Sequence, residues 1–135
     1  MTEQIQAQAL EARSRGVRPD FSHRDLRGLC LKDFNLSLAD FSGSDLSGAD
    51  LEGCDLSHVN LDGCNLSRAN LCWTNLSSSH MAKTTLDEAK LEHADLSGAW
   101  RHAGEVSGQR SARCAGHDFM LTSYPSHHAP NPDCP

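Results

Sequence analysis

The residues best suited to metal chemistry lie near the C-terminus, where Cys114 and His117 form a Cys-x-x-His pair. His127, His128 and Cys134 follow, and Cys and His are the usual ligands of tetrahedral zinc. The later residues lack the compact spacing of a second zinc-binding pair and lie among four of the five prolines. We therefore expect neither a metal site nor any other cofactor.

Catalytic residue types are plentiful, but no arrangement typical of an enzyme is present. The chain is rich in Ser, His and Asp, yet it contains no G-x-S-x-G nucleophile motif and no glycine-rich phosphate loop. The histidines His23, His58 and His93 are far apart in the sequence. We therefore expect no catalytic residues and a protein that is not an enzyme.

The composition alone is poor material for an ordinary globular core. Of the 135 residues, 38% are hydrophobic and only 5% are aromatic, with a formal net charge of −6. The first eight residues lack the basic and then apolar pattern of a secretory signal, and no segment approaches membrane-spanning length. These features predict a soluble, cytoplasmic protein without a membrane partner, whose fold depends on how its few apolar residues are arranged.

The apolar residues follow a strict five-residue period. A five-residue step rotates a helical side chain by roughly 140° and alternates the sides of a flat strand, so neither element would bury this pattern. The period therefore indicates a coil that bends at every unit. Its sixteen central residues, which we predict to form the core, are Phe21, Leu26, Leu31, Leu36, Phe41, Leu46, Leu51, Leu56, Leu61, Leu66, Leu71, Leu76, Met81, Leu86, Leu91 and Leu96.

Each unit also has characteristic neighbours of its centre. Two residues before the centre, eleven of the fourteen positions from Leu29 to Ala94 are Ala, Ser, Cys or Thr, which indicates a second, narrow inward position. Asp or Asn commonly precedes the centre, and six of the ten glycines lie two residues after it. Asp, Asn and Gly are turn formers, so a turn is expected in every unit.

Segments such as Ala49-Asp50-Leu51-Glu52-Gly53 resemble the A-(D/N)-L-x-x signature of the pentapeptide-repeat family. The resemblance implies an all-β solenoid, a right-handed quadrilateral β-helix with four units per coil and therefore about four coils. We assign residues 19–99 to this β-helix, residues 1–18 to an N-terminal capping helix and linker, and residues 100–135 to an irregular C-terminal tail. Residues twenty apart should then lie above one another.

Both ends of a solenoid expose apolar side chains and unpaired backbone, so a cap is expected. We predict a helix over residues 3–15, with Thr2 as N-cap and a stop at Gly16 and Pro19. Its expected apolar stripe consists of Ile5, Ala9, Leu10 and Ala12. At the other end, residues 117–124 could cover the last coil or make a subunit contact, which leaves a monomer and a dimer through the C-terminal end as alternatives.

Three residues at the narrow inward position depart from the repeat. Arg24, Leu29 and Phe34 are too large for this position, so the first coil should be less regular.

Four cysteines occupy ordinary repeat positions and are expected to be reduced rather than disulfide-bonded. These cysteines are Cys30, Cys54, Cys64 and Cys72.

Acidic residues concentrate in one part of the repeat, because residues 33–67 contain seven acids and neither Lys nor Arg. This charge disfavours direct nucleic-acid binding. When residues twenty apart are grouped into one column, the seven acids are distributed over four faces of the coil. Trp73 lies on the face with the most carboxylates. The candidate partner-binding residues are Asp33, Asp40, Asp45, Asp50, Glu52, Asp55, Asp62 and Trp73.

These residues predict a non-catalytic β-helical module that binds a protein partner through an acidic outer surface, which would suit a partner with a basic surface. An alternative function is implied by the resemblance, because the pentapeptide-repeat family includes topoisomerase-inhibiting and quinolone-protecting proteins. In this alternative, the protein inhibits or protects a DNA-handling enzyme of the type II topoisomerase class by partial DNA mimicry. Because a single face presents at most three of the seven carboxylates, the first interpretation is preferred.

Overall fold

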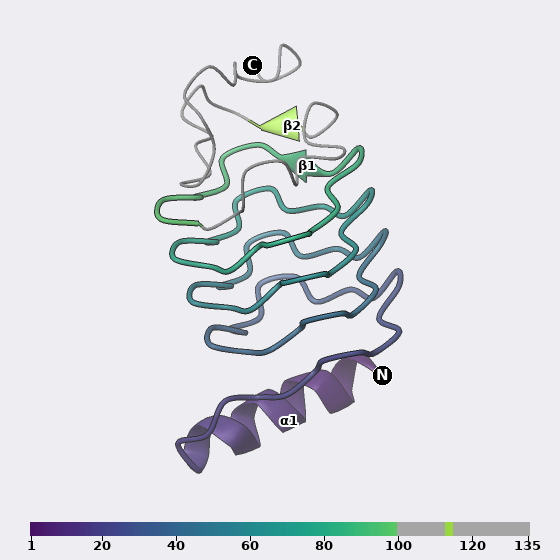
Figure 1. Ribbon diagram of the computed structural model, residues 1–135. Helices are drawn as coiled ribbons and strands as arrows, with labels where there is room; N and C mark the ends of the chain where they lie inside the picture. Colours follow the sequence, from purple (N-terminus) through teal and green to yellow (C-terminus); the bar gives the residue numbers. More distant parts are fainter. Residues whose placement is uncertain (100–112, 115–135) are drawn as a thin grey trace.

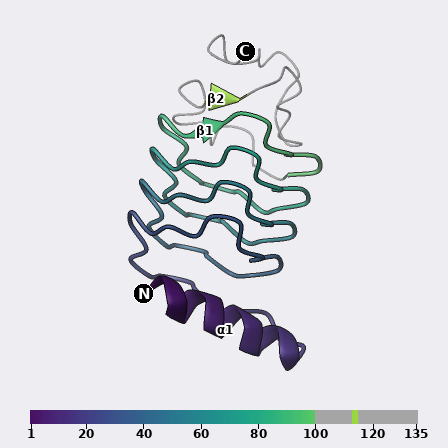
Figure 2. The ribbon, with the colours of Figure 1, turned by 180° about the vertical axis from the view of Figure 1, so that it is seen from behind.

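The computed structural model describes residues 1–99 and 113–114. A helix, α1 (Thr2–Ser14), lies across one end of a tower of stacked coils, and the coils follow one another in sequence order away from the helix (Figure 1). Two short strands, β1 (Lys90–Leu91) and β2 (Arg113–Cys114), lie at the far end. The view from behind shows the same stack of coils with α1 beneath it (Figure 2).

Successive coils pair in parallel at an offset of twenty residues, as the five-residue period predicts for four units per coil. Bridges join Asp20 to Asp40, Asp40 to Asn60, and Asn60 to His80, and the other three sides repeat the pattern. Each bridge is an isolated residue pair. The predicted β-solenoid is therefore present, but its pairing is made at single residues, and β1 and β2 are the regular strands of the described residues.

The unit around Leu51 shows how the backbone satisfies its hydrogen bonds. Leu51 N donates to Asn70 O in the next coil at 2.8 Å, and Gly53 N donates to Cys72 O at 3.0 Å. Within the unit, Cys54 N donates to Leu51 O at 3.1 Å and closes a turn. Successive coils are thus bonded to one another, which meets the requirement that buried backbone groups be paired.

All sixteen predicted core residues are buried, with Leu96 the most accessible at 6%. The stacking columns are also as predicted: the rings of Phe21 and Phe41, twenty residues apart, stack with their centroids 5.1 Å apart. The narrow inward position is filled by small side chains such as Ala49, Cys54 and Thr74. The hydroxyl of Thr74 donates to Leu51 O at 2.9 Å, so this polar atom is buried with a partner.

The residue two after each centre has a positive φ in all sixteen units, yet ten of these residues are not glycine. The turn therefore has its left-handed residue at the third position, as in a type II turn. Side chains at this position point away from the core. The six glycines predicted the turns correctly but marked only part of them.

Helix α1 begins with Met1 as its N-cap, and no side chain caps it, so the predicted Thr2 cap is wrong. The predicted stop is confirmed by a Schellman arrangement, in which Val17 N donates to Ala12 O at 2.9 Å and Gly16 N to Arg13 O at 3.0 Å. Gly16 has the positive φ of 69° that this motif requires.

The face of α1 that meets the first coil contains Ile5, Ala9 and Ala12, which are all buried. Leu10 was expected in the same stripe but is 60% exposed. A hundred-degree step per residue carries Leu10 away from Ala9, so an adjacent apolar pair cannot share one narrow contact.

Polar side chains of α1 bond the open backbone edge of the first coil. Gln8 Nε2 donates to Asp20 O at 3.0 Å, and an Arg13 guanidinium nitrogen donates to Asn35 O at 2.6 Å. In the higher coils, carbonyls at these positions accept from the coil beneath, which the first coil lacks. The helix therefore supplies part of the missing pairing and also covers the apolar end.

The oversized residues of the first coil have room because no coil lies beneath them. Leu29 and Phe34 are partly buried against the core. Arg24 is exposed, with its guanidinium 5.4 Å from the centroid of the Phe21 ring and bonded to Gln8 of α1 and to Asp20. The first coil departs from the repeat rule because it packs on a helix.

At the other end, β2 pairs in parallel with β1, with Arg113 opposite Lys90 and Cys114 opposite Leu91. This pair continues the column of bridges that runs through Asp50, Asn70 and Lys90. The predicted role of residues 117–124 lies outside the described residues.

Candidate interaction surface

The stacked units give the tower four outer faces, which we name by their central residues. Face A contains the units of Phe21, Phe41, Leu61 and Met81, and face B those of Leu26, Leu46, Leu66 and Leu86. Face C contains the units of Leu31, Leu51, Leu71 and Leu91, and face D those of Leu36, Leu56, Leu76 and Leu96.

The seven acids of residues 33–67 do not meet on one face. Face A carries Asp40 and Asp62, face B carries Asp45, face C carries Asp33, Asp50 and Glu52, and face D carries Asp55. Face C is therefore the densest of the four in these carboxylates.

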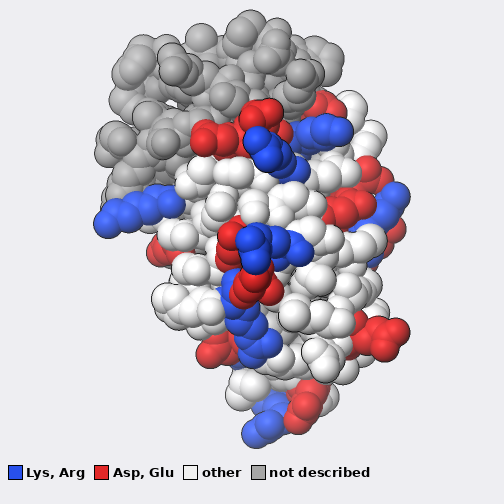
Figure 3. Space-filling model, turned by 90° about the vertical axis from the view of Figure 1, so that its right-hand side faces the viewer, with Lys and Arg blue, Asp and Glu red and all other residues white. Residues whose placement is uncertain are grey.

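Basic residues from adjacent coils interrupt the acidic region. Lys32 Nζ lies 2.9 Å from a Glu52 carboxylate oxygen, and Arg68 Nε lies 3.7 Å from Glu88 on face B. On the side shown in Figure 3, acidic and basic side chains lie next to one another rather than forming a field of one sign. Lys32 was missed because it lies one residue outside the acidic range 33–67, although the twenty-residue spacing places it directly beneath Glu52.

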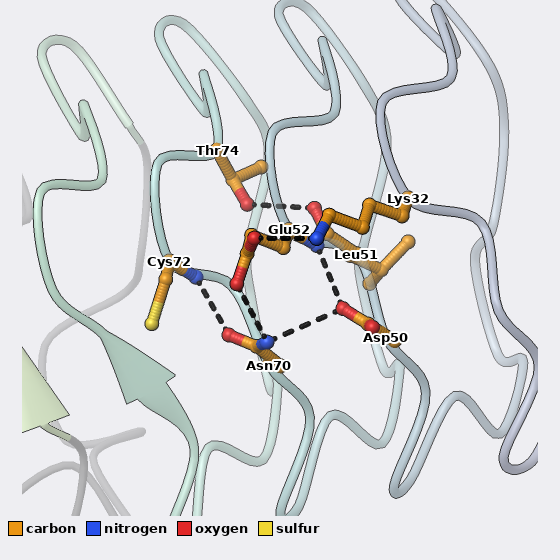
Figure 4. Close-up of polar contacts among 7 residues, drawn as sticks. All are labelled: Lys32, Asp50, Leu51, Glu52, Asn70, Cys72 and Thr74. Atoms are coloured by element: carbon orange, nitrogen blue, oxygen red, sulfur yellow. Dashed lines mark hydrogen bonds and ion pairs between the residues drawn. The ribbon is translucent and has the colours of Figure 1, made fainter.

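The polar side chains of face C form a connected network (Figure 4). Asn70 Nδ2 donates to Asp50 Oδ1 and to Glu52 Oε2, both at 3.2 Å. The hydrogen bond from Lys32 and then that from Asn70 hold the pKa of Glu52 below its usual value. Glu52 is thus ionised and already occupied by two partners from this chain.

Many of the aspartates also have a structural role that does not require charge. Oδ1 of Asp40, Asp45, Asp50 and Asp55 accepts the backbone N–H two residues later, at 2.9 to 3.1 Å. Asn60 makes the same bond in the next coil. The predicted turn role of Asp and Asn is therefore confirmed, and an amide satisfies it as well as a carboxylate.

Trp73 is the large aromatic side chain of face C and is 63% exposed. It lies at a left-handed turn position, with a φ of 61°. Its ring stacks on His93 in the next coil, with centroids 4.1 Å apart and planes inclined by 16°. The stack holds an exposed aromatic ring in one orientation on a rigid backbone.

Beneath Trp73 in the same column is Gly53, and beneath Gly53 is Asp33. A Cβ built on Gly53 would overlap Asp33 Oδ1, so the Asp33 carboxylate leans over the glycine. From the first coil upward, this column therefore contains the Asp33 carboxylate, a glycine, and the indole of Trp73 stacked on the imidazole of His93. Asp33 and Trp73 are forty residues apart in the sequence and lie in the same column, two coils apart.

The cysteines of the repeat are free, as expected. Burial raises the pKa of the Cys54 and Cys64 thiols to about 12, so both remain protonated and unreactive at neutral pH. No group of ligands suitable for a metal ion occurs within residues 1–99. The side chains of the Cys114 and His117 pair, and of His127, His128 and Cys134, lie outside the described part.

A family model described as pentapeptide repeats, in 8 copies, matches residues 20–63, 35–71 and 64–99. These matches span the whole tower and more than half of the chain. The chain belongs to the pentapeptide-repeat family. Proteins of this family are right-handed quadrilateral β-helices that generally serve as structural or interaction modules, and the parallel bridges at twenty-residue spacing agree with that fold.

Solved structures of other family members resemble this pentapeptide-repeat protein. Rfr23 from the cyanobacterium Cyanothece 51142 matches with a TM-score of 0.66 at 21% identity, covering 87% of this chain and 92% of that one. The pentapeptide-repeat protein alr5209 from Nostoc Pcc 7120 matches at 26% identity with a TM-score of 0.43, over 87% and 92% of the chains. QnrB1, a plasmid-mediated fluoroquinolone resistance protein, gives 17% identity and a TM-score of 0.39, over 71% and 50%.

The first of these likenesses supports the fold and carries no information on activity. No curated protein matches the sequence. Among the described residues of this pentapeptide-repeat protein, no helix is long and apolar enough to span a membrane.

Proposed function

We propose that this protein is a non-catalytic binding module that recognises a protein partner through face C. The observation that carries the proposal is Trp73, which is 63% exposed yet fixed by stacking on His93. Exposed Trp residues on rigid supports are common anchors of protein interfaces, because they bury a large area with little loss of side-chain freedom. The carboxylates of face C favour a partner with a basic surface.

The setting of Trp73 supports this role. On the same face, Lys32, Asp50, Glu52 and Asn70 are held together by an ion pair and hydrogen bonds, so the polar part of the surface is preorganised as well as the indole. A preorganised surface loses less conformational entropy on binding than a flexible one. We also propose that the tower is right-handed with four coils, and that it acts in the cytoplasm, where the free cysteines would remain reduced.

The proposal can be tested by the substitution Trp73→Ala. Protein immobilised through its N-terminus should capture a partner from cell extract, and the variant should bind the purified partner at least about tenfold more weakly, as expected for an interface anchor. Leu38→Ala is the matched control, because Leu38 is a 51% exposed side chain at the equivalent turn position of face D. Equal binding by Trp73→Ala and wild type would overturn the proposal.

The alternative is inhibition or protection of a type II topoisomerase by partial DNA mimicry. The acids on all four faces favour it, whereas the ion pairs of Lys32 and Arg68 and the small number of carboxylates per face argue against it. Each of Asp40, Asp45, Asp50 and Asp55 can be changed to Asn with its turn intact. A mimic should alter gyrase supercoiling at micromolar concentration and lose the effect in this quadruple variant, whereas no effect of the wild type would exclude mimicry.

A further inference from the structure

We propose that Trp73, Gly53 and Asp33 form a site on face C for one arginine side chain of the partner. The inference rests on the proposed function and names the chemistry that the surface recognises. The guanidinium would stack on the free face of the indole and pair with the carboxylate beneath it.

The direction of the free indole face follows from the stack with His93. His93 lies one coil above Trp73, and the two rings are nearly parallel at 4.1 Å, so one face of the indole is covered. The other face is directed toward the coil that contains Gly53. Coils are spaced at about 4.8 Å, and the Asp33 carboxylate reaches up to Gly53. A planar group stacked on the free indole face would therefore lie next to this carboxylate.

Gly53 leaves room for the Asp33 carboxylate beneath the indole. Any other residue at Gly53 would place a Cβ where the Asp33 carboxylate now lies, and the φ of 71° also disfavours a side chain there. The equivalent position is filled by His58 on face D, whereas faces A and B have Gly43 and Gly48 there. What distinguishes face C is that an exposed tryptophan lies one coil above this glycine, where faces A and B have Gly63 and Arg68.

Asp33 is the carboxylate beneath Trp73 that is free to bind a cation. Glu52 already pairs with Lys32 at 2.9 Å and accepts a hydrogen bond from Asn70, and Asp50 Oδ1 accepts from both Glu52 N and Asn70. Asp33 is exposed and forms no ion pair within the described residues. Although the neighbouring Lys32 interacts with the Asp33 charge, a partner cation beneath the indole would meet a carboxylate that has no ion pair in the described part of the chain.

The shape and charge favour arginine over other planar or cationic groups. A guanidinium is flat, stacks on indole rings and pairs with carboxylates through two parallel hydrogen bonds. A lysine ammonium could not stack in the same way, and a nucleotide base would bring a phosphate close to Asp33, Asp50 and Glu92. The site thus selects a flat cation on a protein chain.

A direct test uses the peptide acetyl-Gly-Gly-Arg-Gly-Gly-amide and the same peptide with citrulline, which is isosteric with arginine but uncharged. Binding to the full chain is followed by the NMR shift of the Trp73 indole N–H, assigned by comparison with Trp73→Ala. The arginine peptide should bind at least about fivefold more tightly than the citrulline peptide, in keeping with a cation–π contact at an exposed site.

Two matched charge substitutions locate the site. Asp33→Asn keeps the side-chain shape and suits the left-handed turn, and it should weaken arginine binding several-fold. Asp45→Asn removes the same charge on face B while preserving its turn, and it should leave the affinity unchanged. Equal binding of both peptides, or equal weakening by both substitutions, would overturn the arginine site.

The outcome is separable from that of the proposed function. If Trp73→Ala abolishes capture of the protein partner but arginine and citrulline peptides bind alike, face C remains an interface and the arginine site is wrong. If the arginine peptide binds as expected and capture does not depend on Trp73, the arginine site is supported and the proposed interface is wrong.

Discussion

Two local requirements restrict which residue types this tower accepts: a left-handed backbone conformation at each turn, and a small side chain at the narrow inward position. Ten of the sixteen turn residues carry a side chain at positive φ, a conformation that costs L-residues about 1 kcal/mol or more each. The hydrogen bonds between coils hold these residues in place. The free energy of unfolding should therefore respond to substitutions at these turn positions even where the side chain makes few contacts.

Ser77 and Ser78 test the turn demand, because they are adjacent serines on face D and only Ser78 has a positive φ, of 58°. Ser78→Gly should raise the free energy of unfolding by up to about 1 kcal/mol, since glycine relieves the left-handed strain. Ser77→Gly should lower it by roughly 0.5–1 kcal/mol because of the added backbone freedom. Urea unfolding measures both, and the same change in both variants would contradict the turn assignment.

Ser44 and Ser79 test the inward position. The Ser44 hydroxyl donates to Phe21 O at 2.6 Å, whereas the Ser79 hydroxyl is buried without a partner. Ser44→Ala should destabilise the protein by about 1–3 kcal/mol, because a buried carbonyl loses its donor. Ser79→Ala should be neutral or stabilising. Equal losses in thermal or urea unfolding would show that Ser79 is in fact bonded.

At the scale of the elements, α1 caps the first coil. It contributes apolar contact through Ile5 and Ala9 and hydrogen bonds to carbonyls that no lower coil can reach. The helix itself has no side-chain cap at its N-terminus and only a weakly amphipathic sequence. Its stability therefore depends on the tower, as that of the first coil depends on the helix.

The contact is tested by Ile5→Ala, with Leu10→Ala as the matched control. Ile5 is 1% exposed within the core, and its truncation should lower the free energy of unfolding by about 2–4 kcal/mol. Leu10 is 60% exposed, and its truncation should change stability by less than about 0.5 kcal/mol. Amide hydrogen exchange of residues 20–38 should rise in the first variant, and unchanged exchange there would argue against capping by α1.

At the scale of the whole molecule, the tower is a continuous apolar column enclosed by backbone hydrogen bonds, and its faces are free to vary. Each coil contacts its two neighbours, so a defect in the middle separates the tower into two short pieces. The outer faces contribute little to that column. This division allows a surface such as face C to change without loss of the fold.

Leu66→Asp and Leu38→Asp place the same carboxylate inside and outside the column. Leu66 is fully buried, and an unpaired charge there should unfold the protein, since the penalty of several kcal/mol approaches the total stability of a small domain. Leu38 is 51% exposed on a left-handed turn that Asp tolerates, so its variant should unfold at nearly the wild-type temperature. Circular dichroism against temperature distinguishes them, and a folded Leu66→Asp protein would refute the inward assignment.

The sequence by itself determined the sixteen buried centres, the twenty-residue coil, the turn role of Asp and Asn, and a helix before the tower. These features repeat at a fixed spacing, and a burial pattern with a period leaves few structures that satisfy it. It also indicated that Trp73 and Asp33 share a face. The predictions of Thr2 as N-cap and of Leu10 in the buried stripe were wrong, because both depend on the non-repeating contact between α1 and the first coil.

Only the tertiary structure decided how side chains on adjacent coils meet. The pairing of Lys32 with Glu52, the stack of Trp73 on His93, the Asp33 carboxylate over Gly53 and the addition of β2 to β1 each join residues twenty or more apart. Their rotamers depend on neighbours above and below rather than on the repeat, so the period places them in a column without fixing their contacts.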